Sequence, residues 1–123
     1  MLDVELQGLI RSAIRSTWSL ELLLRVRKEP SRSFARDELV LELRSAPALI
    51  DRCIKDLNAA GLLECGADTC KYEPATPALD ALCERLERAY SERPIAVINA
   101  IAQSPRDRRQ SFADAFKITK KDD

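Results

Sequence analysis

Residues 45–77 read SAPALIDRCIKDLNAAGLLECGADTCKYEPATP, and this stretch decides the fold of the chain. Ile50, Ile54 and Leu57 lie 11, 7 and 4 residues before Gly61, so the three side chains share one face of a helix. Gly61 suits the left-handed residue that ends such a helix. The next four residues predict a strand, and a polar turn leads into a second strand. The stretch therefore predicts a helix followed by a β-hairpin.

The preceding residues predict a helix and a short strand. Ser16 or Thr17 can cap a helix that runs from Trp18 to Lys28, and Pro30 ends it because proline cannot continue a helix. Residues 32–34 predict a short strand that pairs with the hairpin. The first half of this helix is apolar on nearly every side, so it needs packing partners on two faces.

A second helix, from Ala35 to Arg44, and a turn at residues 45–47 complete the pattern. Ser45 can cap the helix that follows, and Pro47 suits its first turn. This order of helix, strand, two helices and hairpin, over about residues 18–79, resembles the winged helix-turn-helix superfamily. Within it, the chain looks most like small bacterial regulators that surround the motif with dimerising helices, such as the multiple-antibiotic-resistance regulator type.

The resemblance implies a fold class, a function and an order of domains. The fold is expected to be mainly α with a small β-hairpin wing, an N-terminal helix and a C-terminal helical extension. The function is expected to be that of a DNA-binding transcriptional regulator that acts as a homodimer. The expected segments are an N-terminal dimerisation helix at 1–15, the winged helix-turn-helix core at 16–78, C-terminal dimerisation helices at 79–104 and a charged tail at 105–123.

Basic residues on the second helix of the motif are the expected DNA contacts. With the apolar positions inward, the opposite face presents Arg52, which can pair with guanine, and Lys55, which can hold a phosphate. The full set of expected DNA-binding residues is Ala48, Arg52, Lys55, Lys71, Arg32 and Arg36. Residues 45–77 nevertheless hold three basic residues against five acidic ones. This balance supports an alternative, a winged-helix protein-interaction module that has lost DNA binding and regulates a protein partner.

Composition limits the chain to one soluble domain. It has 123 residues, 46% of them hydrophobic and 33% charged, with 20 basic residues balancing 20 acidic ones. No apolar run is long enough to span a membrane, and acidic residues follow Met1 where a signal peptide would carry basic ones. The absence of histidine removes the usual general base near neutral pH. We therefore expect a cytoplasmic protein that is not an enzyme and needs no cofactor.

The four cysteines are expected to be reduced thiols in the cytoplasm. Cys65 and Cys70 flank the turn of the hairpin, so pairing of the two strands can bring their side chains onto one face. They form a candidate thiol switch, through a disulfide or as half of a thiolate metal site. The alternative for every cysteine is a small buried hydrophobe. Without histidine or a CxxC pair, we expect no metal site.

Apolar residues in the first two helices predict a homodimer. Leu6, Leu9 and Ile10 lie on one stripe of the N-terminal helix. Leu20 and Leu24 point away from the other apolar residues of their own helix. One small core should not need so much apolar surface, so we expect these side chains at a dimer interface.

The C-terminal third predicts two more helices and a tail. Thr76 can cap a long helix, and a further helix runs from Pro94 to Gln103. In the tail, Phe112 and Phe116 are four residues apart, so one helical turn would present both rings together. We expect them to pack on their own chain or across a dimer, and the alternative is a docking peptide for a partner.

Overall fold

A computed structural model describes residues 2–103 of the chain. This part is mainly helical with a small three-stranded antiparallel sheet, which agrees with the predicted fold class at that level of detail. Two expected features, the tail at 105–123 and the packing of Phe112 and Phe116, lie outside the described residues. The elements are α1 (Val4–Ala13), α2 (Thr17–Arg27), β1 (Phe34–Ala35), α3 (Arg36–Leu43), α4 (Pro47–Ala59), β2 (Leu63–Cys65), β3 (Thr69–Tyr72), α5 (Pro77–Glu92) and α6 (Pro94–Ala102).

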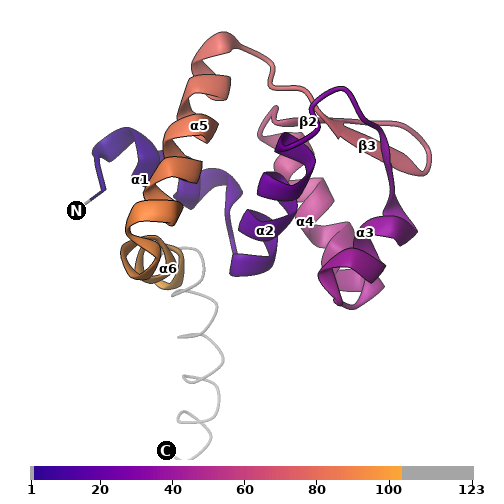
Figure 1. The fold of residues 1–123 in the computed structure, drawn as a ribbon, viewed down its shortest axis with the longest axis horizontal. Helices are drawn as coiled ribbons and strands as arrows, with labels where there is room; N and C mark the ends of the chain where they lie inside the picture. The colour runs from indigo at the N-terminus through magenta and orange to yellow at the C-terminus, as the bar shows by residue number, and fades with distance from the viewer. Residues whose placement is uncertain (1, 104–123) are drawn as a thin grey trace, which may run out of the picture.

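Figure 1 shows how the elements divide between two ends of the molecule. Helices α1, α5 and α6 gather at one end, whereas α3, α4 and the sheet gather at the other. Helix α2 lies between the two groups and contacts α3, α4 and β3. The two groups are not separate, because α1 also contacts α4.

Side-chain caps and prolines begin most of the helices at the positions that the sequence predicts. Ser16 accepts a hydrogen bond from the Ser19 amide at 3.3 Å, and Thr76 accepts one from the Leu79 amide at 3.1 Å. The predicted Ser45 cap is wrong. Helix α4 begins with Pro47, so its cap position is held by Ala46, and the Ser45 hydroxyl is buried without a hydrogen-bond partner.

Gly61 ends α4 in the predicted left-handed conformation, with φ of 82°. Its amide donates to the Asn58 carbonyl at 3.0 Å, and its carbonyl accepts from the Ala75 amide at 2.7 Å. A side chain at this position would lie 3.3 Å from the Ala75 Cβ. The glycine therefore combines a sharp turn with close packing against the segment that leads into α5.

The sheet has the strand order β1-β3-β2, so the short first strand pairs with the far strand of the hairpin. Its register places Phe34 opposite Cys70, and the hairpin places Leu63 opposite Tyr72. The predicted strand at 32–34 is displaced toward Ala35, because the Arg32 amide still closes a turn onto the Glu29 carbonyl at 2.9 Å. The sheet packs β3 against α2.

The core corrects the interface predicted from the first two helices. Leu6, Leu9, Ile10 and Leu20 are all buried within one chain, and Leu24 is half-buried against the same core. Helix α2 does have two apolar faces, as expected. Helix α4 and strand β3 pack against α2, and apolar residues of α1, α5 and α6 belong to the same core. These side chains are therefore not free apolar surface for a second chain.

No helix within residues 2–103 combines the length and apolar character needed to cross a membrane.

Candidate functional site

Helix α4 presents the clearest candidate surface, because its two faces differ sharply. Ile50, Cys53 and Leu57 are buried and turn one face toward the core. Since a helix places residues three and four apart on the same side, the exposed face carries Ala48, Arg52 and Lys55, all exposed as the sequence predicts. We call Arg44, Ala48, Arg52 and Lys55 together the α4 face.

Arg44 is a further exposed cation, in the turn between α3 and α4. It is the C-cap residue of α3 and adopts a left-handed conformation, with φ of 52°. The Ser45 amide then donates to the Val40 carbonyl at 3.2 Å, which closes the end of α3. Arg44 is exposed. It is not among the DNA-binding residues predicted from the sequence, although its place directly between two predicted helices was a usable signal.

The cations of the α4 face are unpaired, which distinguishes them from most of the arginines within residues 2–103. Within residues 2–103, Arg44, Arg52 and Lys55 form no ion pair. The ion-paired cations of the same region are Arg15, Arg25, Arg27, Arg32, Arg36, Lys71, Arg85 and Arg88. The positive charge at the α4 face is thus available to an external anion.

Arg36, one of the expected DNA-binding residues, is engaged by acidic residues within the chain. Its guanidinium donates through two nitrogens to the Asp51 carboxylate of α4, one of these bonds being 3.0 Å, and also pairs with Asp37 at 3.0 Å. The hydrogen bonds from Arg36 lower the pKa of the Asp51 carboxyl. Arg36 therefore joins the start of α3 to the first turns of α4, and a phosphate would have to compete with Asp51 for it.

Arg32 is also engaged within the chain. Its guanidinium pairs with Glu38 and with Glu29, the latter at 3.2 Å. The same group lies 4.3 Å from the ring centroid of Phe34, where cation and ring attract. Arg32 thus stabilises the segment that leads into β1, and a phosphate would have to compete with Glu29 and Glu38 for it.

The hairpin adds no free cation to the α4 face. The Lys71 ammonium lies between two carboxylates, 3.4 Å from Glu64 and 3.6 Å from Glu73. Hydrogen bonding to Glu64, with the charge of Glu73, raises the pKa of Lys71. Asp68 is exposed beside the tip. The hairpin is therefore acidic on balance, and the predicted contribution of Lys71 is largely neutralised.

Cys65 and Cys70 are brought together as the sequence predicts. They face each other across β2 and β3, and both are free thiols. They line a small cavity of about 130 Å³ between the hairpin and α4, shared with Arg36, Asp51 and Ile54. Burial raises the pKa of the Cys70 thiol to about 12, and burial also raises the pKa of Cys65.

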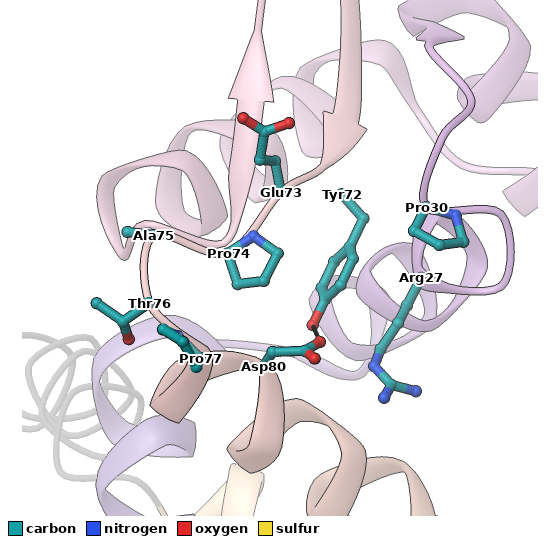
Figure 2. A pocket seen from close by; sticks show the side chains of 9 residues that line it. All are labelled: Arg27, Pro30, Tyr72, Glu73, Pro74, Ala75, Thr76, Pro77 and Asp80. Carbon is teal, nitrogen blue, oxygen red and sulfur yellow. Dashed lines mark hydrogen bonds between the residues drawn. The ribbon is translucent and has the colours of Figure 1, made fainter.

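A larger hollow lies between the end of α2 and the start of α5 (Figure 2). Its volume is about 650 Å³, and sequence reasoning did not anticipate it. The Tyr72 hydroxyl donates to the Asp80 carboxylate at 2.6 Å, and the Arg27 guanidinium lies 5.8 Å from the Tyr72 ring centroid. Arg27 also pairs with Glu87 of α5. The Arg27 Nε is buried without a hydrogen-bond partner, but the other bonds of the cluster hold β3 and α5 against α2.

We compared the chain with protein-family models, curated proteins and solved structures. None of them matches. A functional assignment therefore depends on the geometry and charge of the chain itself. Within residues 2–103, no group of three or more histidine, cysteine or acidic side chains is placed to hold a metal ion.

Proposed function

We propose that residues 16–78 form a winged helix-turn-helix domain that binds duplex DNA, and that the chain acts as a transcriptional regulator. In this proposal α3 and α4 are the helix-turn-helix pair, α4 enters the major groove and the β2–β3 hairpin is the wing. Support comes from the element order α2, β1, α3, α4, β2, β3 and from the strand order β1-β3-β2. A fold of this kind hosts several functions, so the argument for DNA must come from the surface.

The observation that carries the proposal is the cluster of unpaired cations on the α4 face. Arg52 lies at the middle of the exposed face, where its planar guanidinium can pair with a guanine edge. Lys55 lies almost one helical turn after it, Arg44 lies in the turn before α4, and both suit phosphate oxygens. The Ala48 methyl is exposed near the helix start and can contact a thymine methyl. One helix face thus offers both a base-reading group and positioning groups.

The acidic hairpin sets the expected strength of binding. Because Lys71 is held between Glu64 and Glu73, the wing contributes little positive charge. Two phosphate contacts per domain, from Arg44 and Lys55, would weaken binding about 12-fold between 50 and 200 mM salt. We therefore expect modest affinity that depends strongly on ionic strength.

Fluorescence anisotropy with labelled promoter fragments at low and physiological salt tests this proposal. Arg52→Ala should reduce sequence preference, losing about 1–3 kcal/mol against the preferred site. Lys55→Ala and Arg44→Ala should weaken all duplexes alike and reduce the salt slope by about 1. Arg93→Ala is the matched control, since Arg93 is also exposed and without an ion pair among the described residues but lies at the start of α6. Equal losses in all four variants would refute a role for the α4 face.

A second candidate function is a module that binds a protein partner through the same region. The specific observations in its favour are Leu41 of α3, which is 78% exposed, and the acidic balance of the hairpin. An exposed leucine in a domain with an acidic hairpin suits a partner with an apolar and basic surface. No binding to any duplex at low salt, by a folded chain, would favour this function over DNA binding.

The homodimer needs a different surface from the one predicted. Trp18 is 38% exposed and Ile95 is 67% exposed. Trp18 lines an open hollow with Tyr90 and Ile98, and Ile95 lies one helical turn before Ile98. We propose this apolar area, the Trp18–Ile95 surface, as the contact between two copies.

A further inference from the structure

We propose that Cys65 and Cys70 form a reversible disulfide across the hairpin when the chain meets a low-molecular-weight disulfide such as oxidised glutathione. The proposal does not depend on DNA binding. It makes the hairpin a site of thiol modification rather than only a place where two small apolar side chains pack.

The β2–β3 ladder places the two cysteines in a register that suits a disulfide bond. The Gly66 amide donates to the Thr69 carbonyl at 2.8 Å, and the Glu73 amide donates to the Leu62 carbonyl at 3.1 Å. Hydrogen-bonded and non-hydrogen-bonded pairs alternate along an antiparallel ladder. Counting from either bond, Cys65 and Cys70 form a non-hydrogen-bonded pair. Such pairs have Cα atoms about 4.5 Å apart, within the range of about 4.4–6.8 Å that a disulfide needs.

The two thiols differ in access, which assigns their roles. They are direct cross-strand partners in β2 and β3. Cys65 is half-buried, whereas Cys70 is 2% exposed. An external disulfide therefore meets Cys65 first, and Cys70 is held where it can attack the Cys65 sulfur from within the fold.

The reaction is two thiol–disulfide exchanges. The Cys65 thiolate attacks one sulfur of oxidised glutathione, and one glutathione thiolate leaves and takes up a proton. The Cys70 thiolate then attacks the Cys65 sulfur of this mixed disulfide, and the second glutathione leaves in the same way. Two protein thiols are oxidised to one disulfide, and one glutathione disulfide is reduced to two thiols.

Burial makes the exchange slow at neutral pH and steeply dependent on pH. It raises the pKa of both thiols, so the reactive thiolate is a small fraction at pH 7. Below the pKa, that fraction grows about tenfold per pH unit. Cys53 and Cys83 are internal controls, because each is buried on a helix, α4 or α5, and neither is paired with a cysteine in the sheet.

Mass spectrometry of the full chain tests the proposal directly. The chain is held in glutathione buffers of rising oxidised-to-reduced ratio, alkylated with N-ethylmaleimide and digested with trypsin. Residues 56–71 form one tryptic peptide that contains both Cys65 and Cys70, while Cys53 and Cys83 fall in other peptides. The expected product is this peptide lacking two hydrogen atoms and carrying no glutathione. Its rate of formation should rise about tenfold from pH 7 to pH 8.

A variant separates the two exchange steps. Cys70→Ala should stop after the first step and retain glutathione on Cys65, whereas the wild-type chain should not. A lasting glutathione adduct on Cys65 of the wild-type chain would overturn the proposal. So would a disulfide between two chains, or oxidation of Cys53 or Cys83 before the hairpin pair. The wild-type result stands alone if the variant does not fold.

Discussion

Gly61 shows how one residue fixes the relation between α4, the hairpin and α5. Its φ of 82° lies in the left-handed region, and an added Cβ would lie 3.3 Å from the Ala75 Cβ. Alanine at this position would therefore be strained both in its backbone and in its packing.

We expect Gly61→Ala to lower the free energy of unfolding by roughly 1–2 kcal/mol, measured by urea denaturation. Gly8→Ala is the control, because Gly8 lies within α1 and an added Cβ would meet nothing within 4 Å. That substitution should stabilise the chain by about 0.5–1 kcal/mol. An unchanged unfolding midpoint for Gly61→Ala would contradict the proposed strain.

At the scale of the elements, the ion pair between Arg36 and Asp51 links α3 to α4. It also removes one cation and one anion from the surface beside the α4 face. The pair therefore stabilises the fold but weakens the proposed binding of DNA.

Asp51→Asn should destabilise the chain at neutral pH and strengthen its binding to duplex DNA. The pKa of Asp51 is lowered in the folded state, so its stabilisation is present above the unfolded pKa of 3.8 and lost as pH falls through the lower folded value. Melting temperatures of wild-type and variant chains should therefore converge in strong acid. A constant difference down to pH 2 would show that the effect does not come from this carboxylate.

The elements also show which features the sequence could predict. Caps, prolines and Gly61 act locally, so the helix boundaries and the hairpin followed from short patterns. Ser45 was misassigned because Ser45 and Ala46 both precede Pro47, and only the backbone decides which of them is the cap. The partners of Arg32, Arg36 and Lys71 could not be predicted, because each ion pair depends on side-chain positions in the folded chain.

At the scale of the whole molecule, the sequence correctly predicts that the apolar faces of the first two helices are covered. The prediction that a second chain covers them is wrong. Leu20 is fully buried and Leu6 is 5% exposed within one chain, because α1, α5 and α6 close a core around α2 and α4. The apolar periodicity of a helix indicates that one of its faces is buried, but it does not indicate which segment buries it. The proposed homodimer therefore depends on the Trp18–Ile95 surface rather than on these residues.

Light scattering at tens of micromolar should give twice the chain mass of 13.8 kDa. Ile95→Asp should shift the chain to monomer, because the charge would be buried in the contact between copies. Val4→Asp is the control. Val4 is 82% exposed, but it lies on α1, is distant from Trp18 in the sequence and does not line the hollow that contains Trp18. A monomeric wild-type chain at these concentrations would exclude the proposed contact.

The central proposal is that the α4 face binds duplex DNA, and the chain has a competing source of positive charge outside the described residues. The basic residues of the tail are Arg106, Arg108, Arg109, Lys117, Lys120 and Lys121. Titration of the ¹⁵N-labelled full chain with a duplex at low salt, followed by amide chemical shifts, distinguishes the two. We predict the largest shifts at residues 44–56. Shifts confined to residues 104–123, or no shifts at all, would contradict the proposal.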